Sequence, residues 1–247
     1  MEWLHFLPVL FLGALGIIFV EVRLLESFDL RDLGFGNARG RIRDVCEGPQ
    51  IDYIVTGGAG FIGSTLVKAL RTGEGHTVGG KSPRVVVLDN LWRGTLENLK
   101  DDFGIPVIDL KMDFVNVDLT DRKATFEAVR CAKVVYHLAD IVAGVDFVFG
   151  NQGFVFEHNL LINSNVLAAC RRNHIAHYIY VGTACSFPKH LQMSYNIAAL
   201  HENQTYPASP ESSYGWSKLM GEYQAQLMLK EPKGVAFRPN ITVLRFH

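Results

Sequence analysis

The sequence has little of what a metal site, a disulfide framework or a nucleic-acid surface requires. It holds four cysteines among 247 residues, with no C-x-x-C pair and no Cys/His spacing typical of metal ligands. Neither a zinc site nor a disulfide scaffold is therefore predicted, and Cys131 and Cys170, in apolar surroundings, are expected to be inert core residues. The formal net charge of −1 gives no reason to expect nucleic acid as a partner.

Hydrophobic residues are abundant, at 48% of the chain, and their longest run, Leu4–Val20, lies at the amino terminus. A bilayer span needs about 20 apolar residues, so this run predicts a membrane anchor within residues 1–25. A cleaved signal and a misplaced start are the alternatives. Arginines between residues 23 and 43 would keep the following domain on the cytoplasmic side. Without an anchor, the protein would lie in the cytoplasm or the Golgi lumen. Residues 26–50, polar and glycine-containing, are predicted to be a linker.

The rest of the chain is organised around Ile51–Ser64, IDYIVTGGAGFIGS. An apolar run typical of a buried strand breaks into glycines and resumes at helical spacing, and it contains G-x-G-x-x-G in the strand–turn–helix setting that the motif requires. Glycines allow backbone to approach a pyrophosphate, whose charge is stabilised by the N–H groups that open the helix. A plain glycine-rich turn is the alternative. The residues predicted to contact a dinucleotide here are Gly57, Gly60, Phe61, Ile62 and Gly63.

From Ile51 onward, strand and helix patterns alternate, which predicts an α/β fold over residues 51–247. We expect a Rossmann-type, doubly wound parallel sheet. Ligands in such sheets bind at the carboxyl ends of the strands. Further strands are expected at Arg84–Leu88, near Val115–Val117, at Lys133–His137 and at His177–Val181.

The residues that end these strands are predicted to line the cofactor site. Asp89 can accept hydrogen bonds from both hydroxyls of an adenosine ribose and would repel a 2′-phosphate, which favours NAD over NADP. Arg93 nearby keeps NADP open, and a strand-end turn aspartate is the alternative to a ribose ligand. The remaining predicted cofactor contacts are Asn90, Asp118, Leu119, Leu138 and Ala139.

Three residues near the end of the chain have the spacing that proton transfer needs. Thr183 follows the fifth strand, and Tyr214 and Lys218 stand four residues apart, on one face of a helix. A tyrosine hydroxyl has a pKa near 10, and a neighbouring ammonium lowers it. We therefore predict Tyr214 as the base, Lys218 as its activator and a ribose contact, and Thr183 as a hydrogen-bond partner of the substrate. An ordinary exposed helix face is the alternative.

Six motifs in this order carry a resemblance: TGGAGFIG, the strand-end Asp89, VDLTD, HLA, a hydroxyl residue after strand five, and YGWSK. From about Asp52 to His247, the chain resembles the extended short-chain dehydrogenase/reductase family, within it the NAD-dependent sugar-nucleotide epimerases and dehydratases. The resemblance implies NAD as cofactor and a nucleotide-diphosphate sugar as partner. It also implies a possible homodimer through two helices.

Finer sequence details resemble the GDP-mannose 3,5-epimerases and the GDP-fucose synthases: GTACSFPK at 182–189, the run Ala199–Gly215, and the terminal LRFH. In those relatives, a cysteine two positions after the catalytic hydroxyl residue transfers protons at sugar carbons, and that role falls on Cys185. The alternative is a small buried thiol behind the site. The implied reaction is transient oxidation of a GDP-mannose-type sugar by NAD.

The chain also departs from the family pattern. Asp140 stands where relatives usually have alanine, so a carboxylate is expected near the diphosphate, where it would repel the cofactor unless it points away or is protonated. The small C-terminal substrate domain of the family, with its second proton-transfer residue, is expected to be largely absent. A catalytically incomplete NAD-binding module, or a nucleotide-sugar reductase or decarboxylase, therefore stays open as an alternative.

Overall fold

The structure is a computed structural model that describes residues 9–13, 16–20, 45–72, 82–193, 199–232 and 237–246. The chain divides into two units, Met1–Asn37 and Ala38–His247, which we treat separately. Residues 45–50, assigned from sequence to the linker, fall in the second unit, where Val45 is buried.

The first unit contains an antiparallel strand pair rather than the expected membrane-spanning helix. Strands β1 (Val9–Gly13) and β2 (Gly16–Val20) pair along their whole length, from Val9 with Val20 to Gly13 with Gly16. The helix prediction is therefore wrong for these residues, because hydropathy does not separate a helix from a strand pair. Glycine disfavours a helix interior, and β-branched residues favour strands. Among the described residues, no helix has the length and apolarity that a membrane crossing requires.

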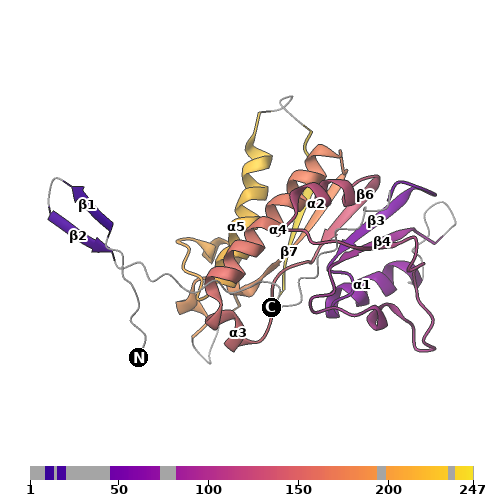
Figure 1. The fold of residues 1–247 in the computed structure, drawn as a ribbon, viewed down its shortest axis with the longest axis horizontal. Helices are drawn as coiled ribbons and strands as arrows, with labels where there is room; N and C mark the ends of the chain where they lie inside the picture. Colours follow the sequence, from indigo (N-terminus) through magenta and orange to yellow (C-terminus); the bar gives the residue numbers. More distant parts are fainter. Residues whose placement is uncertain are drawn as a thin grey trace. The chain divides into compact units, whose positions relative to one another are not determined.

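The second unit is built on a six-stranded parallel sheet of order β5-β4-β3-β6-β7-β8 (Figure 1). From the central β3, the chain moves outward through β4 and β5, then returns to β6 on the other side and moves outward again. This reversal confirms the predicted doubly wound fold. Its strands are β3 (Ile51–Thr56), β4 (Val85–Asp89), β5 (Phe114–Asn116), β6 (Ala132–His137), β7 (His177–Thr183) and β8 (Asn240–Phe246).

Helices connect the strands on both sides of this reversal. Since parallel crossovers are right-handed, connections that run outward in opposite directions lie on opposite faces of the sheet. The α-helices are α1 (Phe61–Thr72), α2 (Arg122–Ala128), α3 (Val145–Gly150), α4 (Gln152–Arg172) and α5 (Ser213–Lys230). The short 3₁₀ helices are η2 (Leu96–Leu99), η3 (Ala184–Ser186), η4 (Lys189–Leu191) and η5 (Glu202–Thr205).

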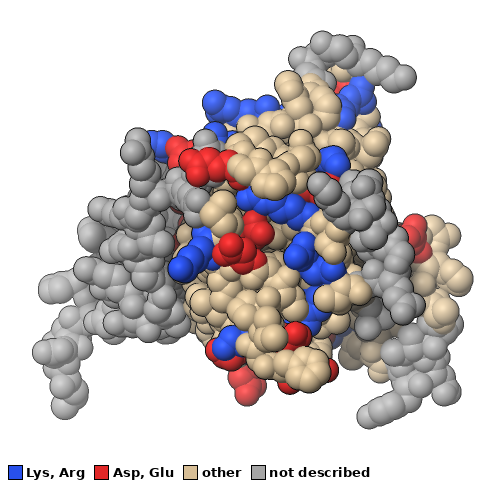
Figure 2. Space-filling view, turned by 90° about the vertical axis from the view of Figure 1, so that its right-hand side faces the viewer, with Lys and Arg blue, Asp and Glu red and all other residues tan. Residues whose placement is uncertain are grey.

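The core lies where α1 packs on the middle of the sheet. All five residues of β4 are buried, as expected of a strand covered on both faces. Val67 and Leu70 of α1 join a cluster with Val55 of β3 and with Val85 and Val87 of β4. In Figure 2, basic and acidic side chains lie interspersed with uncharged ones on the face shown.

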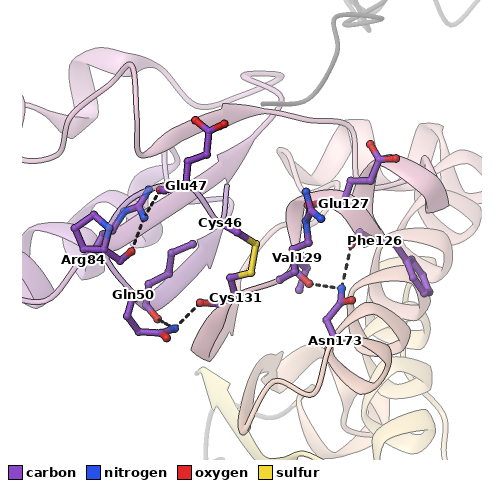
Figure 3. The surroundings of a disulfide bond; sticks show 12 residues. Cys46, Glu47, Gln50, Arg84, Phe126, Glu127, Val129, Cys131 and Asn173 are labelled. Atoms are coloured by element: carbon purple, nitrogen blue, oxygen red, sulfur yellow. Dashed lines mark hydrogen bonds between the residues drawn. A yellow bond between two sulfur atoms is a disulfide. The ribbon is translucent and has the colours of Figure 1, made fainter. Parts of the chain in front are cut away.

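A disulfide bond joins Cys46 to Cys131 across 85 positions of sequence, with their Cα atoms 5.5 Å apart (Figure 3). The cysteine spacing indicated no disulfide scaffold, and the prediction that Cys131 is an inert core residue is wrong. Spacing rules detect local cysteine patterns and miss a long-range pair. Gln50 adds a second link, because its Nε2 donates to the Cys131 carbonyl oxygen at 2.6 Å. The segment before β3 is thus fastened to the start of β6.

Candidate active site

The glycine turn after β3 is held so closely that side chains are excluded from it. Gly57 has a φ of +67°, and a Cβ there would lie 2.8 Å from the Ala139 nitrogen. A Cβ on Gly63 would overlap the Gly57 carbonyl oxygen, and one on Gly60 would lie 3.2 Å from the same atom. The turn leads into the start of α1, whose first N–H groups have no partners within the helix. Such a backbone cradle fits a diphosphate.

The two residues that open α1 expose apolar side chains beside this cradle. Phe61 is 90% exposed and Ile62 is 48% exposed, although both start an otherwise amphipathic helix. Both residues belong to the predicted cofactor set.

Asp89, at the end of β4, is joined to the glycine turn. Its Oδ2 accepts from the Ala59 nitrogen at 3.0 Å, and its Oδ1 accepts from the Leu91 nitrogen at 2.8 Å. Burial raises the pKa of this carboxyl, although both backbone hydrogen bonds oppose that shift. A carboxylate offers about four acceptor positions, so the two bonds leave capacity for ribose hydroxyls.

The other predicted contacts on this side lie after β4 and β5, and their side chains bond their own loops. The Asn90 Oδ1 accepts from the Trp92 nitrogen at 3.0 Å. The Asp118 Oδ1 accepts from the Thr120 nitrogen at 2.9 Å, and Leu119 is buried. These residues lie at the same edge of the sheet as Asp89, because parallel strands end together. No group of His, Cys, Asp and Glu suited to a metal ion occurs in the described part of the chain.

The loop after β6 is fixed by a buried polar chain that sequence reasoning missed. The Thr56 hydroxyl oxygen accepts from the Leu138 and Ala139 nitrogens at 3.2 and 3.1 Å, and it lies 2.7 Å from the His137 Nδ1. The His137 Nε2 lies 2.9 Å from the Asn163 Oδ1. Burial lowers the pKa of His137 to about 3, so the imidazole is neutral. This chain positions Leu138 and Ala139 against the glycine turn.

Asn159 of α4 is a second positioning residue that the sequence analysis did not single out. Its Oδ1 accepts from the Ile141 nitrogen at 2.6 Å, and its Nδ2 donates to the Ile141 carbonyl oxygen at 3.1 Å. The same Nδ2 lies 3.3 Å from the Ser217 Oγ of α5. Neither periodicity nor spacing in the sequence distinguishes Asn159 from an ordinary helix residue.

The predicted catalytic residues converge at the carboxyl end of β7. Thr183 ends the strand, and its Oγ1 accepts from the Cys185 nitrogen at 3.2 Å. Tyr214 and Lys218 lie on α5, whose start is capped by the Ser212 Oγ accepting from the Gly215 nitrogen. A Cβ on Gly215 would overlap the Cys185 carbonyl oxygen, so α5 packs directly on η3. The structure therefore brings all four residues together.

Cys185 is exposed, which does not fit the alternative of a thiol buried behind the site. Cys170, the other free cysteine, is buried. Burial raises the pKa of the Cys170 thiol, as expected for an inert residue.

The environment of Tyr214 differs from expectation. Burial and the Asp140 carboxylate raise the pKa of Tyr214, against a hydrogen bond with Thr183 that lowers it. The expected lowering of the Tyr214 pKa by Lys218 is therefore not found. The Lys218 Nζ lies 6.0 Å from the Tyr214 ring centre, and its charge is engaged elsewhere.

The Lys218 ammonium forms an ion pair with Asp140. Its Oδ2 lies 2.5 Å from the Lys218 Nζ, with 2% and 4% of the two side chains exposed. Lys218 also donates to the Val181 carbonyl oxygen at 2.8 Å. Asp140, expected to repel a diphosphate unless it points away or is protonated, points to the ammonium of the predicted catalytic lysine.

The doubly wound parallel sheet, with a glycine cradle after its first strand, defines a Rossmann-type dinucleotide-binding domain. Tyr214 and Lys218 at its carboxyl edge add the pair found in extended short-chain dehydrogenases/reductases. The family model described as "NAD dependent epimerase/dehydratase family" matches residues 53–240, and the chain belongs to this family.

Several relatives illustrate the range of the family. GDP-mannose 3,5-epimerase 1 of Oryza sativa subsp. indica is 28% identical over 193 residues, which are 78% of this chain and 45% of the relative. The UDP-glucose 4-epimerase of Thermus thermophilus, solved with NAD, superposes with a TM-score of 0.60 at 28% identity, covering 79% of this chain and 54% of that one. The dTDP-glucose 4,6-dehydratase DesIV of Streptomyces venezuelae superposes with a TM-score of 0.64 at 24% identity, covering 79% of this chain and 55% of that one. At this identity, the similarity supports a shared fold only. The chain spans about half the length of the curated relatives it matches.

Proposed function

We propose that this domain binds NAD in the glycine cradle and takes part in the epimerisation or dehydration of a nucleotide-diphosphate sugar. The observation that carries the proposal is one shared edge of the sheet. There, the Gly57–Gly63 cradle and Asp89 follow β3 and β4, and Thr183, Cys185 and the Tyr214–Lys218 pair gather at the end of β7. Bound NAD would supply a hydride acceptor, while the protein supplies geometry and charge.

The residues at this edge of the sheet are proposed to contact different parts of NAD. The glycine cradle and the start of α1 hold the diphosphate, and the free acceptor positions of Asp89 hold the ribose hydroxyls. Phe61 and Ile62 cover the cradle from the solvent side. Asn90, Asp118, Leu119, Leu138 and Ala139 complete the proposed cofactor contacts.

The proposed chemistry falls on the residues around η3. Thr183 hydrogen-bonds the sugar oxygen, and Tyr214 accepts the proton from that hydroxyl. Lys218 contacts the ribose, and its ammonium stabilises the phenolate once it is released from Asp140. Cys185, exposed at the end of β7, removes and returns a proton at a sugar carbon made acidic by the neighbouring carbonyl. GDP-mannose is the favoured substrate, since the resemblance around Cys185 is to enzymes that act on it.

Deuterium exchange tests this proposal directly. With NAD and GDP-mannose in D₂O, the chain is expected to incorporate solvent deuterium into the sugar, and Cys185→Ser is expected to lower the exchange about 100-fold. NAD affinity should stay unchanged. Cys170→Ala is the matched control, since that thiol is free but buried away from the site. Equal exchange in Cys185→Ser and the parent chain would contradict the role of Cys185.

One observation favours a second function, an NAD-binding module without turnover. The pKa of Tyr214 is raised, so its hydroxyl is a weak base near neutral pH. NAD binding without exchange into any nucleotide sugar would support this alternative. Release of CO₂ from a nucleotide-linked uronic acid, or consumption of NADH or NADPH with a keto-sugar, would instead indicate the decarboxylase or reductase alternative.

A homodimer through α4 and α5 is part of the proposal. The two helices are bridged by the Ser164 Oγ and the Gln224 Oε1 at 3.0 Å and by the Arg171–Glu231 ion pair. On their outer sides, Leu161, Tyr223 and Leu227 are each more than 40% exposed. Such apolar side chains suit the burial that a two-helix interface provides.

Gly63→Ala is expected to weaken NAD binding about tenfold and to cost about 1–3 kcal/mol of stability, because its Cβ would overlap the Gly57 carbonyl oxygen. Calorimetric titration with NAD and thermal unfolding measure the two effects. Gly153→Ala in α4 is the control, since a Cβ there has open space. Equal NAD affinity in Gly63→Ala and Gly153→Ala would argue against a diphosphate in this cradle.

A further inference from the structure

We propose that Asp140 is a positioning residue that withholds the Lys218 ammonium from Tyr214 and from NAD, and so restrains the activity of this site. The inference rests on the proposed roles of Tyr214 and Lys218. It starts from the ion pair between the Asp140 Oδ2 and the Lys218 Nζ, whose two side chains are almost fully buried.

The backbone around Asp140 is fixed on both sides. The Ala139 nitrogen, just before it, donates to the Thr56 hydroxyl at 3.1 Å. Ile141, just after it, is held by Asn159 through both its N–H and its carbonyl oxygen. The carboxylate therefore has little freedom to swing out of the site, and its position beside the ammonium is built into the loop.

Lys218 is held as firmly from its own side. Its Nζ donates to the Val181 carbonyl oxygen of β7 at 2.8 Å and lies 5.2 Å from the Tyr180 ring centre. The strand carbonyl and the carboxylate engage two of the three donors of the ammonium. A ligand that needs Lys218 must compete with Asp140.

The titratable groups around the Asp140–Lys218 pair include His137, Tyr178, Tyr180, Tyr214 and Cys185. His137 of β6 is neutral, because burial lowers its pKa to about 3. Tyr178 and Tyr180 of β7 have pKa values raised by burial, with a contribution from Asp140. Burial raises the pKa of Tyr214, and Asp140 and Cys185 of η3 raise it further. Lys218 is thus opposed by a carboxylate, and a phenolate on Tyr214 gains little from it.

The test uses Asp140→Asn, which keeps the shape and an acceptor oxygen but removes the charge. In the protein without NAD, the absorbance of tyrosinate is followed against pH, with Tyr214→Phe identifying the contribution of that residue. Asp140→Asn is expected to move the Tyr214 midpoint down by about one pH unit or more. NAD affinity, measured by calorimetric titration, is expected to rise about tenfold, because the ammonium is released.

Glu222→Gln is the matched control. Glu222 lies on the same helix as Lys218, its side chain is 7% exposed, and it forms an ion pair with Arg245 rather than with Lys218. It is expected to change neither the Tyr214 midpoint nor the NAD affinity. Asp140→Ala is the second variant, and circular dichroism checks that each protein is folded.

The outcomes are distinct. An unchanged Tyr214 midpoint in Asp140→Asn and Asp140→Ala, or weaker NAD binding in both, would overturn the restraining role of Asp140. A lowered midpoint with tighter NAD binding supports it. A lowered midpoint, with no NAD binding by the parent or by either variant, would overturn the proposed function while leaving the withholding of Lys218 from Tyr214 supported.

Discussion

Tyr214→Phe is expected to lower turnover by about 100- to 10,000-fold, the range in which a positioned acid–base group contributes to a rate. The substitution removes one hydroxyl from a mostly buried side chain and keeps the ring against η3 and Lys218. NAD affinity should therefore change by less than about twofold, because binding energy comes from the cradle and Asp89. Deuterium exchange into the sugar and calorimetric titration with NAD measure the two quantities.

Tyr223→Phe is the matched control, since Tyr223 is an exposed tyrosine on the same helix. It should leave both quantities unchanged. A Tyr214→Phe protein that exchanges deuterium at the parent rate would show that another group is the base.

The raised pKa of Tyr214 also fixes the direction of the pH profile. A base acts only when it is deprotonated, and burial together with Asp140 keeps the proton on Tyr214 at neutral pH. Turnover should therefore increase as pH rises from neutrality. A profile that falls over this range would indicate that a different group controls the rate.

The sequence predicted the parts of the site that depend on local pattern. The strand Ile51–Thr56, its glycine turn and α1 are adjacent in the chain, so the motif and its setting could be identified together. Strand-end positions such as Asp89 and Thr183 follow from the topology, because parallel strands end at the same edge.

Contacts between distant segments were beyond sequence reasoning. The pairing of Asp140 with Lys218 joins the β6 loop to α5, and it reverses the expected effect on Tyr214. Asn159 and Asn163 looked like ordinary helix residues until the fold placed them against Ile141 and His137. Neither periodicity nor spacing reports which side chains meet across elements.

The disulfide is the second such contact, and its removal is expected to have the largest effect on stability. The Cys46→Ser/Cys131→Ser double variant should lose about 2–5 kcal/mol of unfolding free energy. The bond closes a loop spanning 85 positions that includes β3, β4, β5 and the helices between them. In the chain-entropy account, closing a loop of this size costs the unfolded state about 4–5 kcal/mol of conformational freedom. Urea unfolding of the oxidised parent and the double variant measures the difference.

Reductant provides the control for this experiment, because it removes the same bond without a mutation. Dithiothreitol should lower the unfolding midpoint of the parent to that of the double variant. The midpoint of the double variant should not change with dithiothreitol. Thiol titration of the denatured, oxidised parent should detect only Cys170 and Cys185. Coincident midpoints for the parent with and without reductant would mean that the bond contributes nothing.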